Sequence, residues 1–179
     1  MRHPLWFFDL DNTLHDASSV IFPYINQSMT AYVASRLGLS PQEASHVREG
    51  YWRQYGATLL GLVRHHEVDP HEFLRETHKF DEVTGRHLHD LAHIVSGEKN
   101  LRQVLNRLPG KKVLLTNAPK AYAQKILKEL GIYHCFQAIE AIEDMVVHQK
   151  WRPKPDSLML RRMLKKYRIA PSQAVLVDD

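Results

Sequence analysis

The chain has 179 residues, of which 44% are hydrophobic, so it can form one packed domain or a domain with an inserted subdomain. Its formal net charge of +4 suits an anionic substrate, but lysine and arginine are scattered, so we expect no nucleic-acid partner. No apolar stretch reaches the length of a membrane span, so no membrane association is expected. The chain has a single cysteine, Cys135, so no internal disulfide can form, and we expect a cytoplasmic protein. Cys135 itself is expected to be a small core residue.

The first predicted element is a strand. Leu5–Phe8 is a continuous apolar run that closes on Asp9, which is typical of a buried parallel strand. Asp9 and Asp11 interrupt the apolar character too early for a signal peptide. We therefore expect a strand and not a signal peptide here.

Residues 18–96 are expected to be almost wholly helical. Pro23 is expected to open a helix that Gly38 closes. Residues 40–43 (Ser-Pro-Gln-Glu) combine an N-cap, a proline at the first helical position and a capping-box glutamate, and predict a helix that runs to about Tyr55 and Gly56. Asp69 and Pro70 start another helix in the same way.

Histidines are concentrated in the middle of the chain. His89 and His93 are four residues apart, which is a spacing that can hold a metal ion on a helix. No HExxH pattern or cysteine partner accompanies them, so we favour an ordinary helix surface over a metal site.

From about residue 97 the pattern alternates between helix and strand. Helices are expected over 101–108, 119–130 and 157–167, and apolar strands at 113–115, from 138, and over 174–177. Short apolar strands that alternate with helices predict a parallel sheet with right-handed crossovers. The predicted fold is α/β, with a Rossmann-like core of residues 1–17 and 97–179 and an all-helical insert of residues 18–96.

Four short segments contain polar residues that a parallel sheet would bring to the carboxyl ends of its strands. Asp9, Thr116 and the pair Asp178 and Asp179 each follow a predicted strand, and Lys154 lies in a loop. Ligands bind beyond the carboxyl ends of the strands in such sheets, so one fold can bring these groups together. Each segment alone has an ordinary structural explanation as a turn or helix cap, but the four together favour a site.

These residue types suit phosphoryl transfer. The Asp9 carboxylate can attack phosphorus and form an aspartyl-phosphate. Mg²⁺ prefers oxygen ligands, which Asp9, Asp178 and Asp179 offer, and Lys154 can neutralise remaining charge. The Thr116 hydroxyl can hold the phosphoryl oxygens. Asp11 can protonate the leaving alkoxide and then deprotonate the hydrolytic water. Asn117, next to Thr116, is a candidate substrate-binding residue.

The four segments resemble the motifs of the haloacid dehalogenase (HAD) superfamily of phosphohydrolases. The first motif, DxDxT, is Asp9-Leu10-Asp11-Asn12-Thr13; the second ends in Thr116, the third is Lys154-Pro155, and the fourth ends in Asp178-Asp179. The resemblance implies an Mg²⁺ cofactor with Asp179 as the main acidic ligand and Asp178 beside it. It also implies that Asp11 offers its backbone carbonyl to the metal and that the helical insert is a C1-type cap. Family members continue past the fourth motif, whereas this sequence stops at Asp179.

A narrower resemblance lies in the insert. Residues 51–62 (YWRQYGATLLGL) are similar to a segment of the pyrimidine 5′-nucleotidase branch, which implies nucleoside monophosphates such as UMP or CMP as substrates. Tyr55 and Thr58 then become substrate-binding candidates. The aromatic residues Tyr51, Trp52 and Tyr55 could stack on a base or pack the insert, and Gly56 marks a break between helices.

Rival functions remain at this point. Within the superfamily, a sugar-phosphate phosphatase or mutase is the alternative, because only the cap separates it from a nucleotidase. A dehalogenase is disfavoured, since Asp11 is present and a halide leaves without a proton. From another class, a non-catalytic binding protein on a HAD core is possible, but intact Asp9, Asp11, Thr116 and Lys154 count against it. The sequence does not determine the oligomeric state.

Overall fold

The computed structural model describes residues 3–79, 95 and 97–179. The chain divides into two compact units, one of residues Met1–Ser18 with Asp90–Asp179 and the other of Ser19–His89. The sequence analysis divides it at residues 17/18 and 96/97. His89 and His93, for which a metal site was considered and disfavoured, lie outside the described residues.

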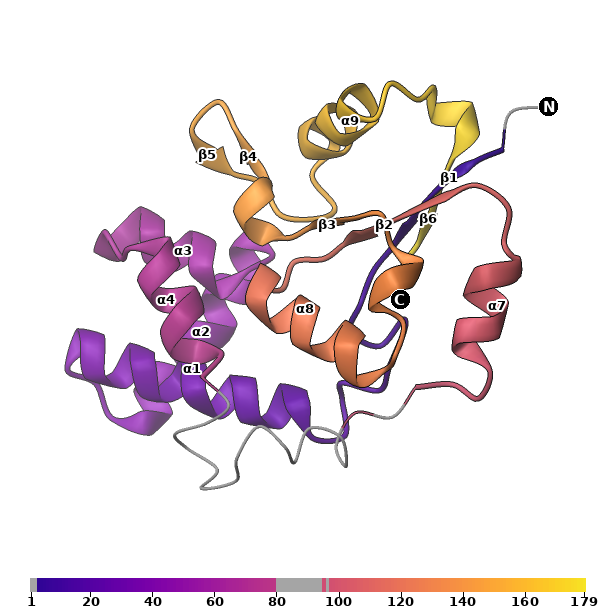
Figure 1. Cartoon of the computed structure of the whole chain (residues 1–179). Coiled ribbons are helices and arrows are strands. Elements are labelled where there is room, and N and C mark those ends of the chain that lie inside the picture. Colours follow the sequence, from indigo (N-terminus) through magenta and orange to yellow (C-terminus); the bar gives the residue numbers. More distant parts are fainter. Residues whose placement is uncertain (1–2, 80–94, 96) are drawn as a thin grey trace. The chain divides into compact units, whose positions relative to one another are not determined.

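A parallel sheet forms the centre of the first unit, which we call the core unit (Figure 1). Its four strands run in the order β3-β2-β1-β6, and every pairing is parallel. The strands are β1 (Leu5–Phe8), β2 (Lys111–Leu115), β3 (Ala138–Glu140) and β6 (Ala174–Val177). Phe8 pairs with Leu114 and with Val177, so β1, β2 and β6 end at the same edge. The predicted α/β class with a Rossmann-like parallel sheet is confirmed.

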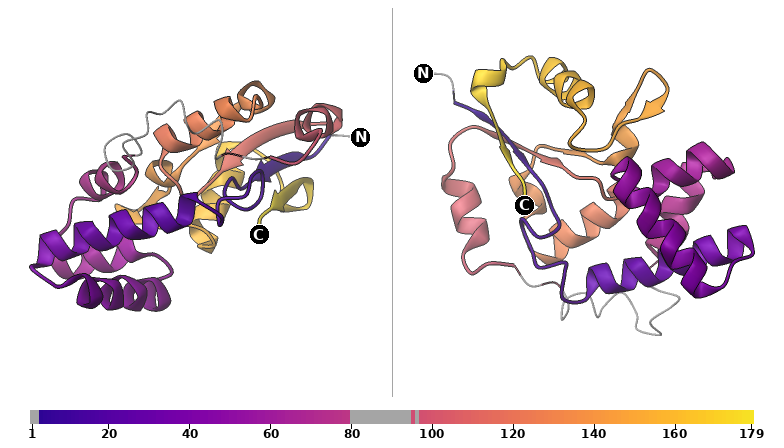
Figure 2. Two further views of the ribbon diagram at one scale, coloured as in Figure 1. Left: turned by 90° about the horizontal axis from the view of Figure 1, so that it is seen from below. Right: turned by 180° about the vertical axis from the view of Figure 1, so that it is seen from behind.

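Helices lie on both sides of this sheet, with α8 and α9 on opposite sides (Figure 1, Figure 2). Met159 and Met163 of α9 pack with Phe7 in one apolar cluster. Phe8 has the opposite orientation along the strand, and its ring meets Phe136 edge to face at 6.0 Å. The helices in the described part of the unit are α7 (Leu101–Arg107), α8 (Lys120–Glu129) and α9 (Ser157–Lys166), with 3₁₀ turns at Tyr133–Cys135, Ile142–Asp144 and Pro171–Gln173.

A hairpin of the core unit was not predicted. β4 (Val146–Val147) and β5 (Lys150–Trp151) form an antiparallel hairpin. The two residues between them, His148 and Gln149, both have positive φ angles of 51° and 61°. Such a turn normally contains asparagine or glycine. The sequence lacks that signal, so the hairpin could not be recognised from it.

Asp156 is the N-cap of α9 and provides a stability test. Its Oδ1 accepts hydrogen bonds from the N–H groups of Leu158 and Met159, and its Oδ2 lies 2.8 Å from Arg152. Burial alone would raise the pKa of Asp156, but these hydrogen bonds outweigh burial and lower the pKa below its ordinary value.

We expect Asp156→Ala to lower the free energy of unfolding by about 1 kcal/mol at neutral pH, because a helix cap is lost. A lowered folded-state pKa stabilises the protein above the ordinary carboxyl pKa, and this part is lost as the pH falls through the folded-state value. Urea unfolding at neutral pH and below the carboxyl range measures the difference. Asp156→Asn keeps a capping group without the charge, so its free energy of unfolding should lie between those of the wild type and Asp156→Ala. If Asp156→Ala lost equal stability at both pH values, the charge contribution would be contradicted.

The second unit is helical over its described residues. Its helices are α1 (Ile21–Leu37), α2 (Pro41–Tyr55), α3 (Thr58–His66) and α4 (Pro70–Thr77). α1 begins at Ile21, two residues before the expected Pro23; proline is tolerated there because N–H groups of the first turn lack intrahelical partners. The predicted capping box between Ser40 and Glu43 is present. No helix in the described part of the chain is long and apolar enough to cross a membrane.

Candidate active site

The register of the sheet places three predicted site residues at one edge. The Asp9 N–H donates to the Val177 carbonyl at 2.9 Å, directly before Asp178. The Thr116 N–H donates to the Glu140 carbonyl at 3.0 Å. Each ladder therefore extends by one hydrogen bond past the strand, and the residues that follow β1, β2 and β6 sit at the carboxyl ends.

Lys154 bridges two of the predicted carboxylates. Its Nζ lies 2.7 Å from Oδ1 of Asp9 and 3.0 Å from Oδ1 of Asp178. The side chains of Lys154 and Asp9 are only 7% and 9% exposed. Burial raises the pKa of Asp9, because the charged carboxylate loses solvation, while the Lys154 ion pair partly opposes the rise. The arrangement places a poorly solvated carboxylate beside one fixed positive charge.

Three carboxylates at this edge form a group that can hold a metal ion. Asp9, Asp178 and Asp179 each offer one oxygen, and these atoms lie within 4.8 Å of one another. Asp9 is buried and the other two are exposed. Hard oxygen donors, few in number and open to water, are the set that Mg²⁺ takes, since this ion keeps several of its waters. The residues present therefore fit Mg²⁺.

Asn117 contacts the loop that contains Lys154. Its Oδ1 accepts a hydrogen bond from the Lys154 N–H at 2.8 Å, and its Nδ2 donates to the Lys154 carbonyl at 3.2 Å. The side chain predicted to bind substrate therefore also holds the backbone of the lysine. No sequence signal links residues 117 and 154, so this contact could not be anticipated.

Thr116 is 1% exposed and lies just before α8. Its Oγ1 accepts a hydrogen bond from the Ala118 N–H at 3.1 Å. A hydroxyl that accepts from the backbone still has its own proton to donate. Thr116 can therefore donate a hydrogen bond to an oxygen of a bound phosphate.

Asp11 makes contacts that the sequence analysis missed. Its Oδ1 accepts a hydrogen bond from the Tyr122 hydroxyl at 2.5 Å and lies 2.9 Å from Nε2 of His15. Burial, and then the charge of Asp11, raise the pKa of Tyr122, so the phenol stays protonated and donates. The predicted acid/base group is thus held by two aromatic side chains. In the sequence, only the four-residue spacing of Asp11 and His15 could have suggested one of these contacts.

The candidate residues of the helical unit are engaged within that unit. Tyr51 packs closely over Gly61, and its hydroxyl lies 2.6 Å from His66. Thr58 is buried, and its hydroxyl donates to the Arg48 carbonyl at 3.1 Å. These contacts assign both side chains a packing role.

Two other aromatic candidates are more accessible. The Tyr55 hydroxyl lies 2.6 Å from Nε2 of His65 in an exposed contact, and Trp52 is 59% exposed. Trp52 therefore offers an aromatic face that the fold does not cover.

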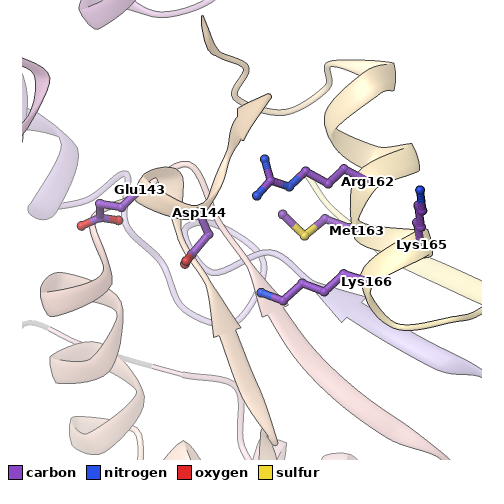
Figure 3. Close-up of a pocket in the computed structure, with 6 residues that line it drawn as sticks. All are labelled: Glu143, Asp144, Arg162, Met163, Lys165 and Lys166. Carbon is purple, nitrogen blue, oxygen red and sulfur yellow. The ribbon is translucent and has the colours of Figure 1, made fainter. Parts of the chain in front are cut away.

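A pocket of about 420 Å³ lies elsewhere in the core unit (Figure 3). Figure 3 shows Arg162, Met163 and Lys166 directed toward Asp144. Asp144 pairs with Lys120 at 2.7 Å. The lining residues are Glu143, Asp144, Arg162, Met163, Lys165 and Lys166. They include none of the predicted site residues, so we place the candidate chemistry at the strand ends.

Relatives of the chain include phosphatases. It is 28% identical over 160 residues to "Phosphate metabolism protein 8" of Saccharomyces cerevisiae, covering 85% of this chain and 48% of that protein. It is 25% identical to a "Phosphoglycolate phosphatase" of Vibrio cholerae, covering 96% and 74%. It is 28% identical to a "Phosphoglycolate phosphatase" of Pseudomonas fluorescens, covering 98% and 62%. The chain thus spans about half of the yeast protein.

Solved structures and a family profile agree on the fold. A HAD phosphatase from Thermococcus onnurineus matches with a TM-score of 0.59 and 20% identity, covering 98% of this chain and 76% of that one. L-2-haloacid dehalogenase from Xanthobacter autotrophicus matches with a TM-score of 0.55 and 15% identity, covering 97% and 69%. The profile of the family described as haloacid dehalogenase-like hydrolase matches residues 5–179. The chain therefore belongs to the haloacid dehalogenase-like hydrolase family.

Proposed function

We propose that the protein is an Mg²⁺-dependent phosphomonoester hydrolase that acts through an aspartyl-phosphate on Asp9. The observation that supports this most is the position of Lys154 between Asp9 and Asp178 at the carboxyl edge of the sheet. Bound Mg²⁺, held by Asp9, Asp178 and Asp179, would neutralise the charge of the phosphate.

In the first step, a carboxylate oxygen of Asp9 attacks phosphorus while the bond from phosphorus to the ester oxygen breaks. Lys154 and the Thr116 hydroxyl hold the phosphoryl oxygens, and Lys154 offsets their negative charge. Asp11 gives a proton to the leaving alkoxide. The products of this step are an alcohol and an acyl phosphate on Asp9.

In the second step, water attacks the phosphorus of the acyl phosphate. Asp11, now ionised, removes a proton from that water, and the bond between Asp9 and phosphorus breaks. Inorganic phosphate leaves, and both aspartates return to their starting states. Asn117 contributes by holding the backbone of Lys154 in place.

The substrate class we favour is a small phosphorylated acid or sugar. Relatives named phosphoglycolate phosphatase cover nearly the whole chain, and they support this class over a nucleotide. The nucleotide interpretation also loses support from Tyr51 and Thr58, whose hydroxyls bond within the helical unit. One observation still favours a pyrimidine nucleoside monophosphate as second candidate: Trp52 is exposed and could stack on a base.

A substrate panel tests the proposal. We expect phosphate release with Mg²⁺ from phosphoglycolate and sugar phosphates in preference to UMP and CMP, with p-nitrophenyl phosphate as a general reporter. Phosphate release is measured for the wild type and for Trp52→Ala. If nucleotides are preferred and Trp52→Ala weakens only their turnover, the second candidate is correct, because the cap would act on the leaving group. Release from no ester at all is the result expected of a non-catalytic binding protein.

A further inference from the structure

Two buried side chains reach the same oxygen of Asp11. The Tyr122 hydroxyl donates to Oδ1 at 2.5 Å, and Nε2 of His15 lies 2.9 Å from that oxygen. Tyr122 belongs to α8, whereas His15 follows β1 by a short loop. Both contacts are therefore made with Oδ1 of Asp11 rather than with Oδ2.

The surroundings hold this arrangement in place. Tyr122 is 3% exposed and His15 is 4% exposed. The backbones of Asp11 and His15 also form an isolated β-bridge. Side chains fixed by packing and by hydrogen bonds hold a reactive group in one geometry without further ordering.

The ring nitrogens of His15 and the hydroxyl of Tyr122 argue that these side chains do more than fill space. Nδ1 of His15 is buried and has no hydrogen-bond partner among the described residues. Burying a polar atom without a partner is unfavourable, and an apolar residue would avoid that cost. The polar contact that the ring does make is that of Nε2 with Asp11. A phenylalanine would likewise fill the place of Tyr122 without a hydroxyl.

We propose that Tyr122 and His15 are positioning residues that orient Asp11 so that Oδ2 transfers the proton. This inference rests on the proposed function. The proton on Oδ2 moves to the leaving alkoxide oxygen as its bond to phosphorus breaks, and a proton from the hydrolytic water later returns to Oδ2. Tyr122 and His15 keep their own protons throughout, so the steps balance with no further reactant.

A series of phosphate esters with leaving groups of different basicity tests the role of the hydroxyl. For Tyr122→Phe we expect kcat/KM to fall about tenfold for alkyl esters, as when a hydrogen bond to a charged group is lost. The fall should be less than about twofold for p-nitrophenyl phosphate, whose leaving group needs little protonation. If the role of Tyr122 were purely structural, kcat/KM would fall by the same factor for every ester.

A double-mutant cycle with Asp11 distinguishes a positioning role of Tyr122 from a purely structural one. In an Asp11→Asn background, Tyr122→Phe should cause no further loss, since the residue through which it acts is gone. Tyr167→Phe is the matched control, because the Tyr167 hydroxyl also donates to a carboxylate, that of Glu140, and its loss should leave the leaving-group dependence unchanged.

His15 is tested by a pair of variants. His15→Gln keeps an N–H donor and should retain more alkyl-ester activity than His15→Leu, which keeps only the bulk. Circular dichroism and thermal unfolding identify any variant that fails to fold.

The outcomes are distinct. A wild type that hydrolyses esters, with Tyr122→Phe losses that are uniform across leaving groups or additive with Asp11→Asn, overturns the positioning role and leaves the proposed function intact. A folded wild type that hydrolyses no ester overturns both.

Discussion

Asp9→Asn is expected to reduce phosphate release to background, a loss of roughly 10⁴-fold or more, as for removal of an enzyme nucleophile. The amide cannot attack phosphorus to form the acyl phosphate, and it is a poorer ligand for a cation. The measurement is steady-state phosphate release from p-nitrophenyl phosphate and phosphoglycolate. A variant that keeps more than a trace of wild-type turnover would remove Asp9 as the nucleophile.

Stability measurements show whether such a loss is chemical. Because burial raises the pKa of Asp9 in the folded state, its protonated form stabilises the fold at low pH, and this contribution is lost as the pH rises through the folded-state pKa. Without added metal at neutral pH, Asp9→Asn should therefore be at least as stable as the wild type in urea. Asp16→Asn is the control for an aspartate of the same loop that lies outside the metal group.

Removal of divalent metal is expected to abolish turnover, and Ca²⁺ is expected to inhibit. The dianionic phosphate and the Asp9 carboxylate repel each other, and Lys154 supplies only one positive charge against Asp9 and Asp178. Ca²⁺ accepts more ligands in looser geometry than Mg²⁺, so it would let Asp9 bind through both oxygens and spoil its line of attack.

The metal prediction is measured by titration of EDTA-treated protein with Mg²⁺ or Ca²⁺, following phosphate release and, by calorimetry, binding. Asp178→Asn and Asp179→Asn should each weaken Mg²⁺ binding, since each removes one carboxylate of the three-residue group. Glu143→Gln, whose carboxylate accepts the Lys120 N–H away from that group, serves as the control. Full turnover in EDTA, or full activity with Ca²⁺, would contradict the metal assignment.

The sequence by itself determined the features that depend on local physics. β1 and β6 have the bounds expected from their apolar runs. The burial expected of a parallel strand holds for β1, whereas β6 is an edge strand of the sheet that leaves Val175 and Leu176 exposed. The capping box at Ser40 and the N-cap at Asp69 were equally readable, since the groups involved lie within a few residues of one another. The gathering of Asp9 and Asp178 followed from topology, because parallel strands end at a common edge.

Only the tertiary structure decided the contacts between residues that lie far apart along the chain. Tyr122 reaches Asp11 across 111 residues, and Asn117 holds Lys154 across 37 residues. Such hydrogen bonds depend on how α8 and the lysine loop pack at the sheet edge, and no periodicity or spacing encodes that packing. On a shorter scale, the Thr58 hydroxyl donates to the Arg48 carbonyl ten residues away, a contact that depends on how α3 packs against α2.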